Sequence, residues 1–237
     1  MVETNQVVVE RVEKEIPYRG KGYLILRQCP PEELEAVLDR EAAALFSLGA
    51  KQVYVSSGDS DAAFRGGMLG PWRLTFRHEM LDLFRELDES RPRPNGRLRL
   101  ELLDQGREAE WLDCYNEGFF RVPNAQTYLP EDLEEVRAKG GLLGFALLRG
   151  RPVGVYELLP GGECPEISGI ALRESVRGQG LGRELLLSTM DLLADLGKSR
   201  CRLLVSTGNI PALTLYRETG FGEDMVRGRW YEVMTHG

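Results

Sequence analysis

The sequence predicts a mixed α/β protein: an α/β domain with a mixed sheet over residues 97–237, preceded by an additional α/β segment over residues 1–90. The first observation behind this class is that strand-like alternation of apolar residues is interleaved with helix-like spacing, which excludes a helix bundle and a β-sandwich. The second is an ordinary globular composition, with 42% hydrophobic and 28% charged residues in a chain of 237. The third is the stretch 85–96, which lacks the apolar pattern and contains two prolines and an Asn-Gly turn, as linkers do.

The N-terminal segment is predicted to combine several strands with one helix. Pro30 and Pro31 introduce that helix, which spans residues 32–46, because proline fits the first positions of a helix. The strands are predicted at residues 7–9, 23–26, 52–55 and 72–76. Residues 19–22, Arg-Gly-Lys-Gly, imitate a phosphate-binding loop, but a strand-like stretch follows them, so no helix N-terminus faces the turn. We expect a hairpin turn there.

The domain over residues 97–237 is predicted to alternate strands and helices. Its predicted strands are residues 98–102, 142–148, 152–158, 167–172, 201–205 and 229–234. Its predicted helices are residues 107–120, 131–138, 181–196 and 211–218. Residues 149–151, Arg-Gly-Arg, form a short turn that makes the strands on either side an antiparallel hairpin. Pro130 marks the start of one helix and Gly197 the end of another.

The N-terminal segment contains one echo of the C-terminal domain. Residues 48–59 and residues 196–209 both read Leu-Gly, then a strand, then Ser-Ser/Thr-Gly-Asp/Asn, and they align with a gap of two residues. An internal duplication would make residues 1–90 a degenerate half of a second domain of the same kind. A helix, a glycine and a strand also recur by chance in α/β proteins, so both interpretations stay open.

The cysteine and histidine content excludes several enzyme classes. The cysteines are dispersed, without the two-residue spacing of zinc or redox sites, and we interpret them as reduced thiols: Cys29, Cys114, Cys164 and Cys201. The only other histidine, His236, is penultimate, so a histidine-based zinc site or a serine triad would have to rest on His78 alone, and no Gly-x-Ser-x-Gly motif accompanies it. We therefore expect no metal.

Charge and hydropathy argue against other partners. The net charge of −7 is spread evenly over the chain, whereas a nucleic-acid-binding protein needs basic residues in excess or in clusters. No apolar run approaches the roughly 18 residues of a membrane helix. Residues 1–5 lack the basic and apolar regions of a signal peptide. We expect a cytoplasmic protein with neither nucleic acid nor a membrane as partner.

The most informative stretch is the loop before the third helix of the C-terminal domain. Gly178, Gly180 and Gly182 occupy alternate positions, and an amphipathic helix starts at once. Glycine lets a backbone approach a ligand closely, and a helix N-terminus offers unpaired N–H groups and partial positive charge. The pattern predicts a phosphate-binding loop, with Arg177 and Arg183 adding charge at its ends.

Two common phosphate-binding loops do not fit this stretch. A Walker loop needs Gly-Lys-Ser/Thr, which does not occur in the sequence. A dinucleotide-binding fold needs an acidic residue at the end of the next strand, where this chain has Val205-Ser-Thr. Taken alone, the loop leaves a tight strand-to-helix connection without a ligand open as an alternative.

A second motif follows the loop at a fixed distance. The loop reads Arg177-x-x-Gly180-x-Gly182, and residues 209–221 read Asn-x-x-Ala-x-x-Leu-Tyr-x-x-x-Gly-Phe. Together they resemble the signature of the GNAT superfamily of N-acetyltransferases, and the resemblance covers residues 97–237. It implies a GNAT-like acetyltransferase fold, with acetyl-CoA as cosubstrate and no metal.

The resemblance also implies roles for individual residues. The backbone of Ile170 and Leu172 would hydrogen-bond the acetyl group and the pantetheine arm, and Asn209 would meet the cofactor where two strands splay apart. Tyr216 would be the general acid that protonates the leaving thiolate, since a phenol with a pKa of about 10 is protonated at neutral pH. The pyrophosphate would be held beside Arg177 by the amides of Gly178, Gln179, Gly180, Leu181, Gly182 and Arg183.

The transfer also needs a base, because an amine must lose a proton when it attacks a thioester. Since histidine is scarce in this sequence, a carboxylate is expected. Glu166, at the start of the strand that leads into the loop, is the first candidate, and Glu157 and Glu117 are its rivals. The chain departs from the family at Glu174, where many relatives have a proline, which should alter the entry of the loop and leave its donors in place.

The predicted function is the direct transfer of an acetyl group from acetyl-CoA to a primary amine of a small molecule, a peptide or a protein. The alternative is a catalytically inactive GNAT-like module that binds an acyl-CoA for regulation. Residues 118–123 combine two phenylalanines with an arginine and are the candidate wall of the acceptor pocket; a helix end packed on the core is the other interpretation. The oligomeric state, monomer or homodimer, stays open.

Overall fold

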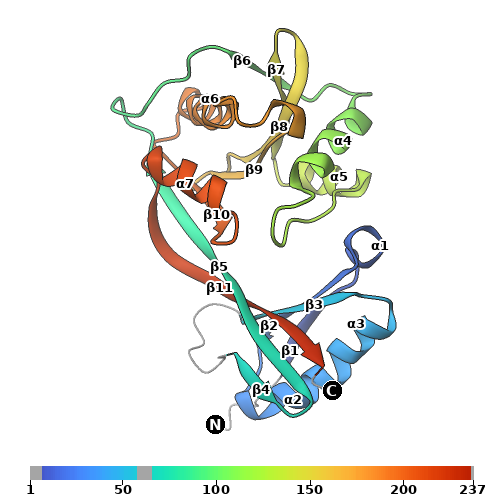
Figure 1. Ribbon diagram of the computed structural model, residues 1–237. Helices are drawn as coiled ribbons and strands as arrows, with labels where there is room; N and C mark the ends of the chain where they lie inside the picture. Colours follow the sequence, from blue (N-terminus) through green and yellow to red (C-terminus); the bar gives the residue numbers. More distant parts are fainter. Residues whose placement is uncertain (1–6, 58–65, 236–237) are drawn as a thin grey trace. The chain divides into compact units, whose positions relative to one another are not determined.

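The computed structural model describes residues 7–57 and 66–235 (Figure 1). Residues 1–5, Gly58, Asp59 and His236, which entered the sequence predictions, lie outside the described residues. The strands are β1 Val8–Val12, β2 Lys21–Gln28, β3 Gln52–Ser57, β4 Gly67–Leu69, β5 Trp72–Glu86, β6 Leu98–Leu102, β7 Leu142–Leu148, β8 Arg151–Leu159, β9 Glu166–Leu172, β10 Arg200–Ser206 and β11 Gly222–Thr235.

The helices alternate with these strands. They are α1 Ile16–Arg19, α2 Leu34–Val37, α3 Ala43–Ser47, α4 Glu108–Phe119, α5 Pro130–Ala138, α6 Leu181–Asp195 and α7 Ile210–Glu218. Three short turns of other helical types are η1 Pro31–Glu33, η2 Leu38–Ala42 and η3 Glu174–Val176. Every strand and helix predicted over residues 97–237 is present at its predicted place, which confirms the mixed α/β class.

The chain divides into two compact units. Unit 1 comprises residues 1–81, 206–208 and 225–237, and unit 2 comprises residues 82–205 and 209–224. Strands β5 and β11 have residues in both units. The sequence instead placed the division in the stretch 85–96. Strand β5 continues to Glu86, so the change of unit falls within a strand rather than in the linker. That residues 1–90 are a degenerate half of a second acetyltransferase domain remains a prediction.

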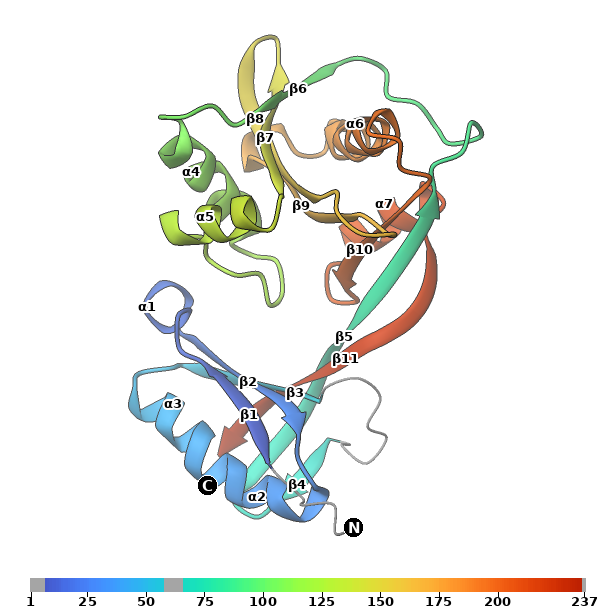
Figure 2. The same cartoon turned by 180° about the vertical axis from the view of Figure 1, so that it is seen from behind.

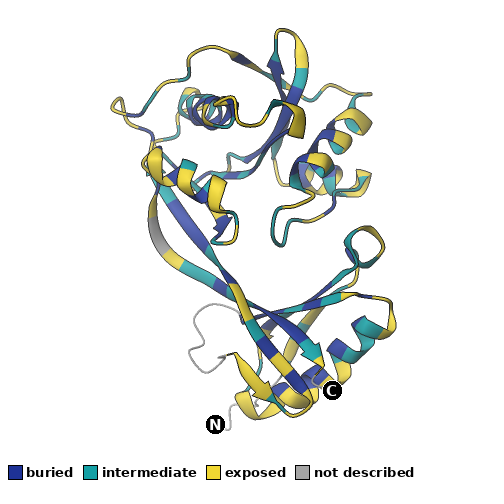
Figure 3. Cartoon of the chain, viewed as in Figure 1, coloured by how far each residue is buried: buried dark blue, intermediate teal, exposed yellow. Residues whose placement is uncertain are grey.

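Unit 1 consists of a sheet with helices on one face. Its strand order is β1-β2-β3-β11-β5, with β4 paired to β5. Strands β1 and β2 are antiparallel, joined through α1 and the left-handed Gly20, which confirms the hairpin expected there. Side chains of the helical residues 31–47, such as Val37, Leu38 and Leu45, share one hydrophobic core with Val53 of the sheet. Figure 3 shows the buried stretches of the chain in dark blue.

Unit 2 is a sheet with helices on both faces. Its strands follow the order β10-β9-β8-β7-β6, and β9 with β10 is the parallel pair. Figures 1 and 2 show α4 and α5 on one face of this sheet and α6 on the other. Trp111 and Tyr115 of α4 pack with Phe145, Val155 and Ala171 of three successive strands in one hydrophobic core. Pairing of β7 with β8 confirms the predicted antiparallel hairpin.

Strands β5 and β11 extend furthest beyond their predicted bounds. Strand β5 extends ten residues beyond the predicted end at Phe76, and it contains His78 and Asp82, polar residues that are buried and that interrupt the apolar pattern. Strand β11 begins at Gly222, before a glycine and several charged residues that are typical of a loop. Within the described residues, no helix is long and apolar enough to cross a membrane.

Candidate active site

A glycine-rich loop joins β9 to α6 in unit 2. After the turn η3, Gly178 and Gly180 have positive φ values of 76° and 74°, a conformation that side chains disfavour. Gly180 is the N-terminal cap of α6, and no side chain caps the helix there. Among the described residues, the N–H groups of residues 178–183 have no backbone or side-chain acceptor. They form a run of free donors at a helix N-terminus, which suits an anion.

The glycines of this loop differ in what surrounds them. A Cβ atom at Gly178 would meet nothing within 4 Å, so this position faces open space. A Cβ atom at Gly182 would touch the side chains of Leu215 and Leu172 at 3.7 and 4.0 Å. Gly182 therefore lies on the packed side of the loop, where α7 approaches it, and a methyl group fits there without displacing a neighbour.

Strand β9 turns backbone groups toward β10 next to this loop. The Arg173 N–H donates to the Val153 carbonyl of β8, so the backbone groups of Arg173 point toward β8. Backbone N–H and C=O groups of successive residues in a strand point to alternate sides, so those of Leu172 and Ile170 point away from β8, toward the β10 side of β9. On that edge β9 pairs with β10 at Glu166 and Arg202, and no further pair is registered between these two strands, both of which are fully described. The edge at Ile170 and Leu172 is therefore not paired with β10.

A β-bulge precedes this unpaired edge. Leu158 of β8 pairs with Ile167, and Glu157 of β8 pairs with Gly169, so Ser168 is an extra residue in β9. A bulge redirects the backbone groups that follow it. Because of the bulge at Ser168, the start of β9 pairs with β10, whereas the backbone N–H and C=O groups of Ile170 and Leu172 point to the same side of β9 and are not paired with β10.

The guanidinium of Arg177 is bound to backbone carbonyls. Its Nε and Nη2 donate to the Leu172 carbonyl at 3.1 and 3.0 Å, and Nη2 also donates to the Gly118 carbonyl at 2.8 Å. Arg177 thus joins the end of β9 to the end of α4. The sequence predicts only its charge at the loop, whereas the structure shows in addition that this side chain fixes the start of the loop.

Helix α7 carries the two residues of the second motif. Asn209 is the N-terminal cap of α7, and its side-chain amide makes no hydrogen bond to another described residue. Tyr216 is 9% exposed and packs on Phe221, with 5.9 Å between ring centroids. Its hydroxyl makes no hydrogen bond to another residue in the described part of the chain. Burial raises the pKa of Tyr216 to about 12, so the phenol is protonated at neutral pH.

Two of the three candidate bases are held by arginines. Glu166 accepts a 2.7 Å hydrogen bond from Arg202 Nη2 and a 3.3 Å bond from the Ser168 hydroxyl. Glu117 is paired with Arg173 and accepts the Glu174 N–H at 3.0 Å. Both carboxylates are therefore engaged in ion pairs with arginine side chains.

Glu157 is the third candidate, and its surroundings are different. The side chain is 4% exposed, and the Tyr128 hydroxyl donates to Glu157 Oε2 at 2.9 Å. Burial raises the pKa of Glu157, while the hydrogen bond from Tyr128 lowers it. Asn116 of α4 holds Tyr128 in place, because its side-chain amide exchanges hydrogen bonds of 2.9 and 2.8 Å with the Tyr128 backbone.

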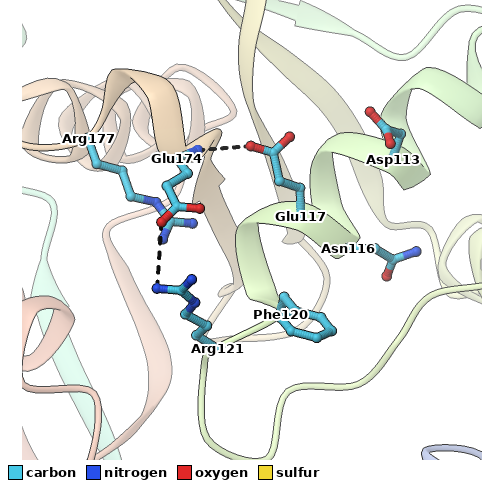
Figure 4. A pocket seen from close by; sticks show the side chains of 7 residues that line it. All are labelled: Asp113, Asn116, Glu117, Phe120, Arg121, Glu174 and Arg177. Atoms are coloured by element: carbon cyan, nitrogen blue, oxygen red, sulfur yellow. Dashed lines mark hydrogen bonds and ion pairs between the residues drawn. The ribbon is translucent and has the colours of Figure 1, made fainter. Parts of the chain in front are cut away.

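A pocket of about 450 Å³ opens between the end of α4 and the turn η3 (Figure 4). Its lining residues are Asp113, Asn116, Glu117, Phe120, Arg121, Glu174 and Arg177. Phe120 and Arg121 belong to the predicted pocket wall at residues 118–123. Glu174, at the position where a proline was expected, pairs with Arg121 at 3.6 Å across the pocket. The lining therefore contains charges of both signs.

We compared the sequence with models of known protein families. The model of the acetyltransferase (GNAT) family matches residues 100–221, which is more than half of the chain. The chain belongs to the GNAT acetyltransferase family. The glycine-rich loop, α7 and the candidate bases Glu117, Glu157 and Glu166 all lie within the matched residues.

Solved structures share the fold of this GNAT protein over nearly its whole length. A GCN5-related N-acetyltransferase from Sphaerobacter thermophilus is 16% identical, with 97% of this chain and 76% of that chain covered at a TM-score of 0.62. A conserved protein of unknown function from Staphylococcus epidermidis is 11% identical, with coverages of 100% and 94% and a TM-score of 0.61. A GCN5-related N-acetyltransferase from Kribbella flavida is 16% identical, with coverages of 91% and 82% and a TM-score of 0.56. A comparison with curated protein sequences gives no match.

The structure also shows site residues of this GNAT protein that the sequence did not indicate. Tyr128 contacts Glu157 from 29 residues away, and Arg97 donates to the Gln179 carbonyl at 3.0 Å from 82 residues away. Neither belongs to a sequence motif, so only the fold reveals them. Among the described residues there is no group of three or more His, Cys, Asp or Glu side chains that could hold a metal ion.

Proposed function

We propose that this chain is an N-acetyltransferase that uses acetyl-CoA and transfers the acetyl group directly to a primary amine of a small molecule, a peptide or a protein. The observation that carries the proposal is the run of free N–H donors at residues 178–183, which continues from the unpaired edge of β9. Acetyl-CoA supplies a thioester, whose acyl carbon an amine can attack. The residues that would hold it, activate the amine and release the thiol are all in unit 2.

The loop fits the pyrophosphate of CoA on three counts. Its N–H groups are free, a helix N-terminus favours negative charge, and Gly178 leaves its outer side open. The backbone groups of Ile170 and Leu172 would bind the acetyl end and the pantetheine arm. The Leu172 carbonyl already accepts hydrogen bonds from Arg177. We therefore assign the N–H of Leu172, and not its carbonyl, to the cofactor.

Tyr216 suits the role of general acid. A thiolate that leaves an acyl group takes up a proton, and a phenol that is protonated at neutral pH can donate one. Burial raises the pKa of Tyr216 to about 12, which keeps the proton on its oxygen until the thiolate charge develops. The hydroxyl makes no hydrogen bond with a described residue, so it is free to donate.

Among the candidate bases we favour Glu157 over Glu166. A useful base has a pKa close to the working pH, and burial moves the pKa of Glu157 in that direction. Glu157 pairs with Gly169, the neighbour of Ile170, so it lies beside the strand that would bind the acetyl group. Glu166 stays the alternative; its carboxylate lies in an ion pair with Arg202, with 2.7 Å between Glu166 Oε2 and Arg202 Nη2.

Thiol release from acetyl-CoA, measured with a panel of primary amines, tests this function. We expect release that depends on an amine and that drops on Tyr216→Phe while CoA binding persists. CoA binding without thiol release on any amine, with the wild type and Tyr216→Phe alike, would support the regulatory binding module instead.

A further inference from the structure

A buried carboxylate ties the linker before β6 to the first turn of α6. The side chain of Glu184 is 3% exposed, and its two oxygens accept the backbone N–H groups of Asn95 and Arg97, each at 2.8 Å. Both N–H groups are therefore satisfied by one charged side chain, a strong form of hydrogen bond. This places the backbone of Arg97 at a fixed position next to the helix N-terminus.

The side chain of Arg97 then reaches the phosphate-binding loop. Its Nη1 donates to the Gln179 carbonyl at 3.0 Å and lies 3.9 Å from the position that a Cβ atom of Gly180 would take. The residue is exposed, and its remaining guanidinium N–H groups have no acceptor among the described residues. The linker, the loop and α6 are thus connected in a closed chain of hydrogen bonds.

The bond to the Gln179 carbonyl determines where the Gly180 N–H points. In a trans peptide unit the C=O of one residue and the N–H of the next point in opposite directions within one plane. A carbonyl that is held toward Arg97 therefore directs the Gly180 N–H away from Arg97, toward the free side of the loop. Control of this kind matters here, because Gly180 is one of the two residues whose dihedral angles set the orientation of this peptide unit, and glycine restricts its rotation least.

We propose that Arg97, anchored by Glu184, is a positioning residue for the pyrophosphate of the acyl-CoA, acting through the Gln179 carbonyl on the Gly180 N–H. The inference rests on the proposed function, because it assumes that this loop binds CoA. It adds a residue that lies outside both sequence motifs and outside the matched family region, which begins at residue 100.

Calorimetric titration of CoA and of 3′-dephospho-CoA into the full chain tests the proposal. The variants are Arg97→Ala, Arg97→Lys and the control Arg99→Ala. Arg99 lies two residues away, its side chain is 68% exposed, and its partner is Glu101 rather than the loop. Both alanine variants remove one positive charge, so they separate a specific contact from a general loss of charge.

We expect Arg97→Ala to weaken binding of both nucleotides about tenfold, the size of one lost hydrogen bond to a charged group. Arg97→Lys should recover most of the affinity, and Arg99→Ala should bind as the wild type does. In steady-state assays, Arg97→Ala should raise KM for acetyl-CoA by a similar factor and leave kcat within about twofold.

Unchanged affinity of Arg97→Ala, or an equal loss in Arg99→Ala, would overturn the positioning role. A loss for CoA that is absent for 3′-dephospho-CoA would also overturn it, because Arg97 would then act on the 3′-phosphate and not through Gly180. If the wild type binds neither nucleotide, the proposed function fails first, so the two failures are distinguishable.

Discussion

The Tyr128 hydroxyl donates a hydrogen bond of 2.9 Å to Glu157 Oε2, inside a part of unit 2 where the Glu157 side chain is 4% exposed. The two residues come from different elements, the loop before α5 and strand β8. Burial alone makes the ionised carboxylate unfavourable, and the phenol hydrogen bond compensates in part. This balance would set the pH range in which Glu157 can act as a base.

Replacing Glu157 by Gln should abolish the base and keep the shape of the side chain. We expect kcat to fall by about 10²–10⁴. Stability should not fall, because burial raises the pKa of Glu157 in the folded state, so its ionised form at neutral pH opposes folding. The check is the rate of thiol release together with the melting temperature. Glu166→Gln is the matched control, and a larger loss of kcat in Glu166→Gln would reassign the base to Glu166.

Removing the Tyr128 hydroxyl should move the pH dependence of the rate. The hydrogen bond lowers the pKa of Glu157, so Tyr128→Phe lets burial raise that pKa further. A base works in its ionised form, and the acid limb of the pH–rate profile should therefore shift to higher pH. The measurement is kcat/KM over a range of pH. An acid limb that stays in place, or one that moves to lower pH, contradicts the assignment.

Replacing Tyr216 by Phe removes the proposed acid without changing the packing on Phe221. We expect kcat to fall by about a hundredfold or more and the Kd for CoA to stay unchanged. Because the pKa of Tyr216 is raised to about 12, the wild-type rate should show no loss from ionisation of this phenol near neutral pH. A variant with full kcat would show that the thiolate leaves without this acid.

Replacement by alanine should be harmful at one loop glycine and neutral at another. Gly180 has a φ of 74°, where a side chain costs about 1–2 kcal/mol, so Gly180→Ala should destabilise unit 2 and weaken CoA binding. At Gly182 the added methyl would only touch Leu215 and Leu172, and Gly182→Ala should behave as the wild type. Thermal unfolding and titration of CoA measure both effects. Equal behaviour of the two variants would contradict the loop geometry.

Glu184 should matter for stability as well as for the loop. Glu184→Gln replaces one of two accepting oxygens by a donor, which leaves one of the N–H groups of Asn95 and Arg97 without an acceptor. We expect a loss of about 1–3 kcal/mol in the free energy of unfolding, measured in urea. Glu163→Gln, an exposed loop position, serves as the control for charge. Equal stability of both variants would show that the linker is held by other contacts.

The sequence predicts the elements of unit 2 because each is encoded locally. Apolar spacing indicates the amphipathic α6, and glycine at positions 178 and 180 indicates a tight turn. The sequence does not predict contacts between distant segments, such as Arg97 with Gln179 or Tyr128 with Glu157, because polar side chains carry no periodic signal that names their partner. The same limit explains β5, where buried polar residues conceal the continuation of the strand.

The most direct test of the account is the fate of an isotopically labelled acetyl group. The full chain is incubated with labelled acetyl-CoA and a panel of primary amines, and free thiol and acetylated amine are measured together by mass spectrometry. The account predicts that the label appears on the nitrogen of at least one amine, in equal amount to the thiol released. Binding of CoA without label on any amine would contradict it.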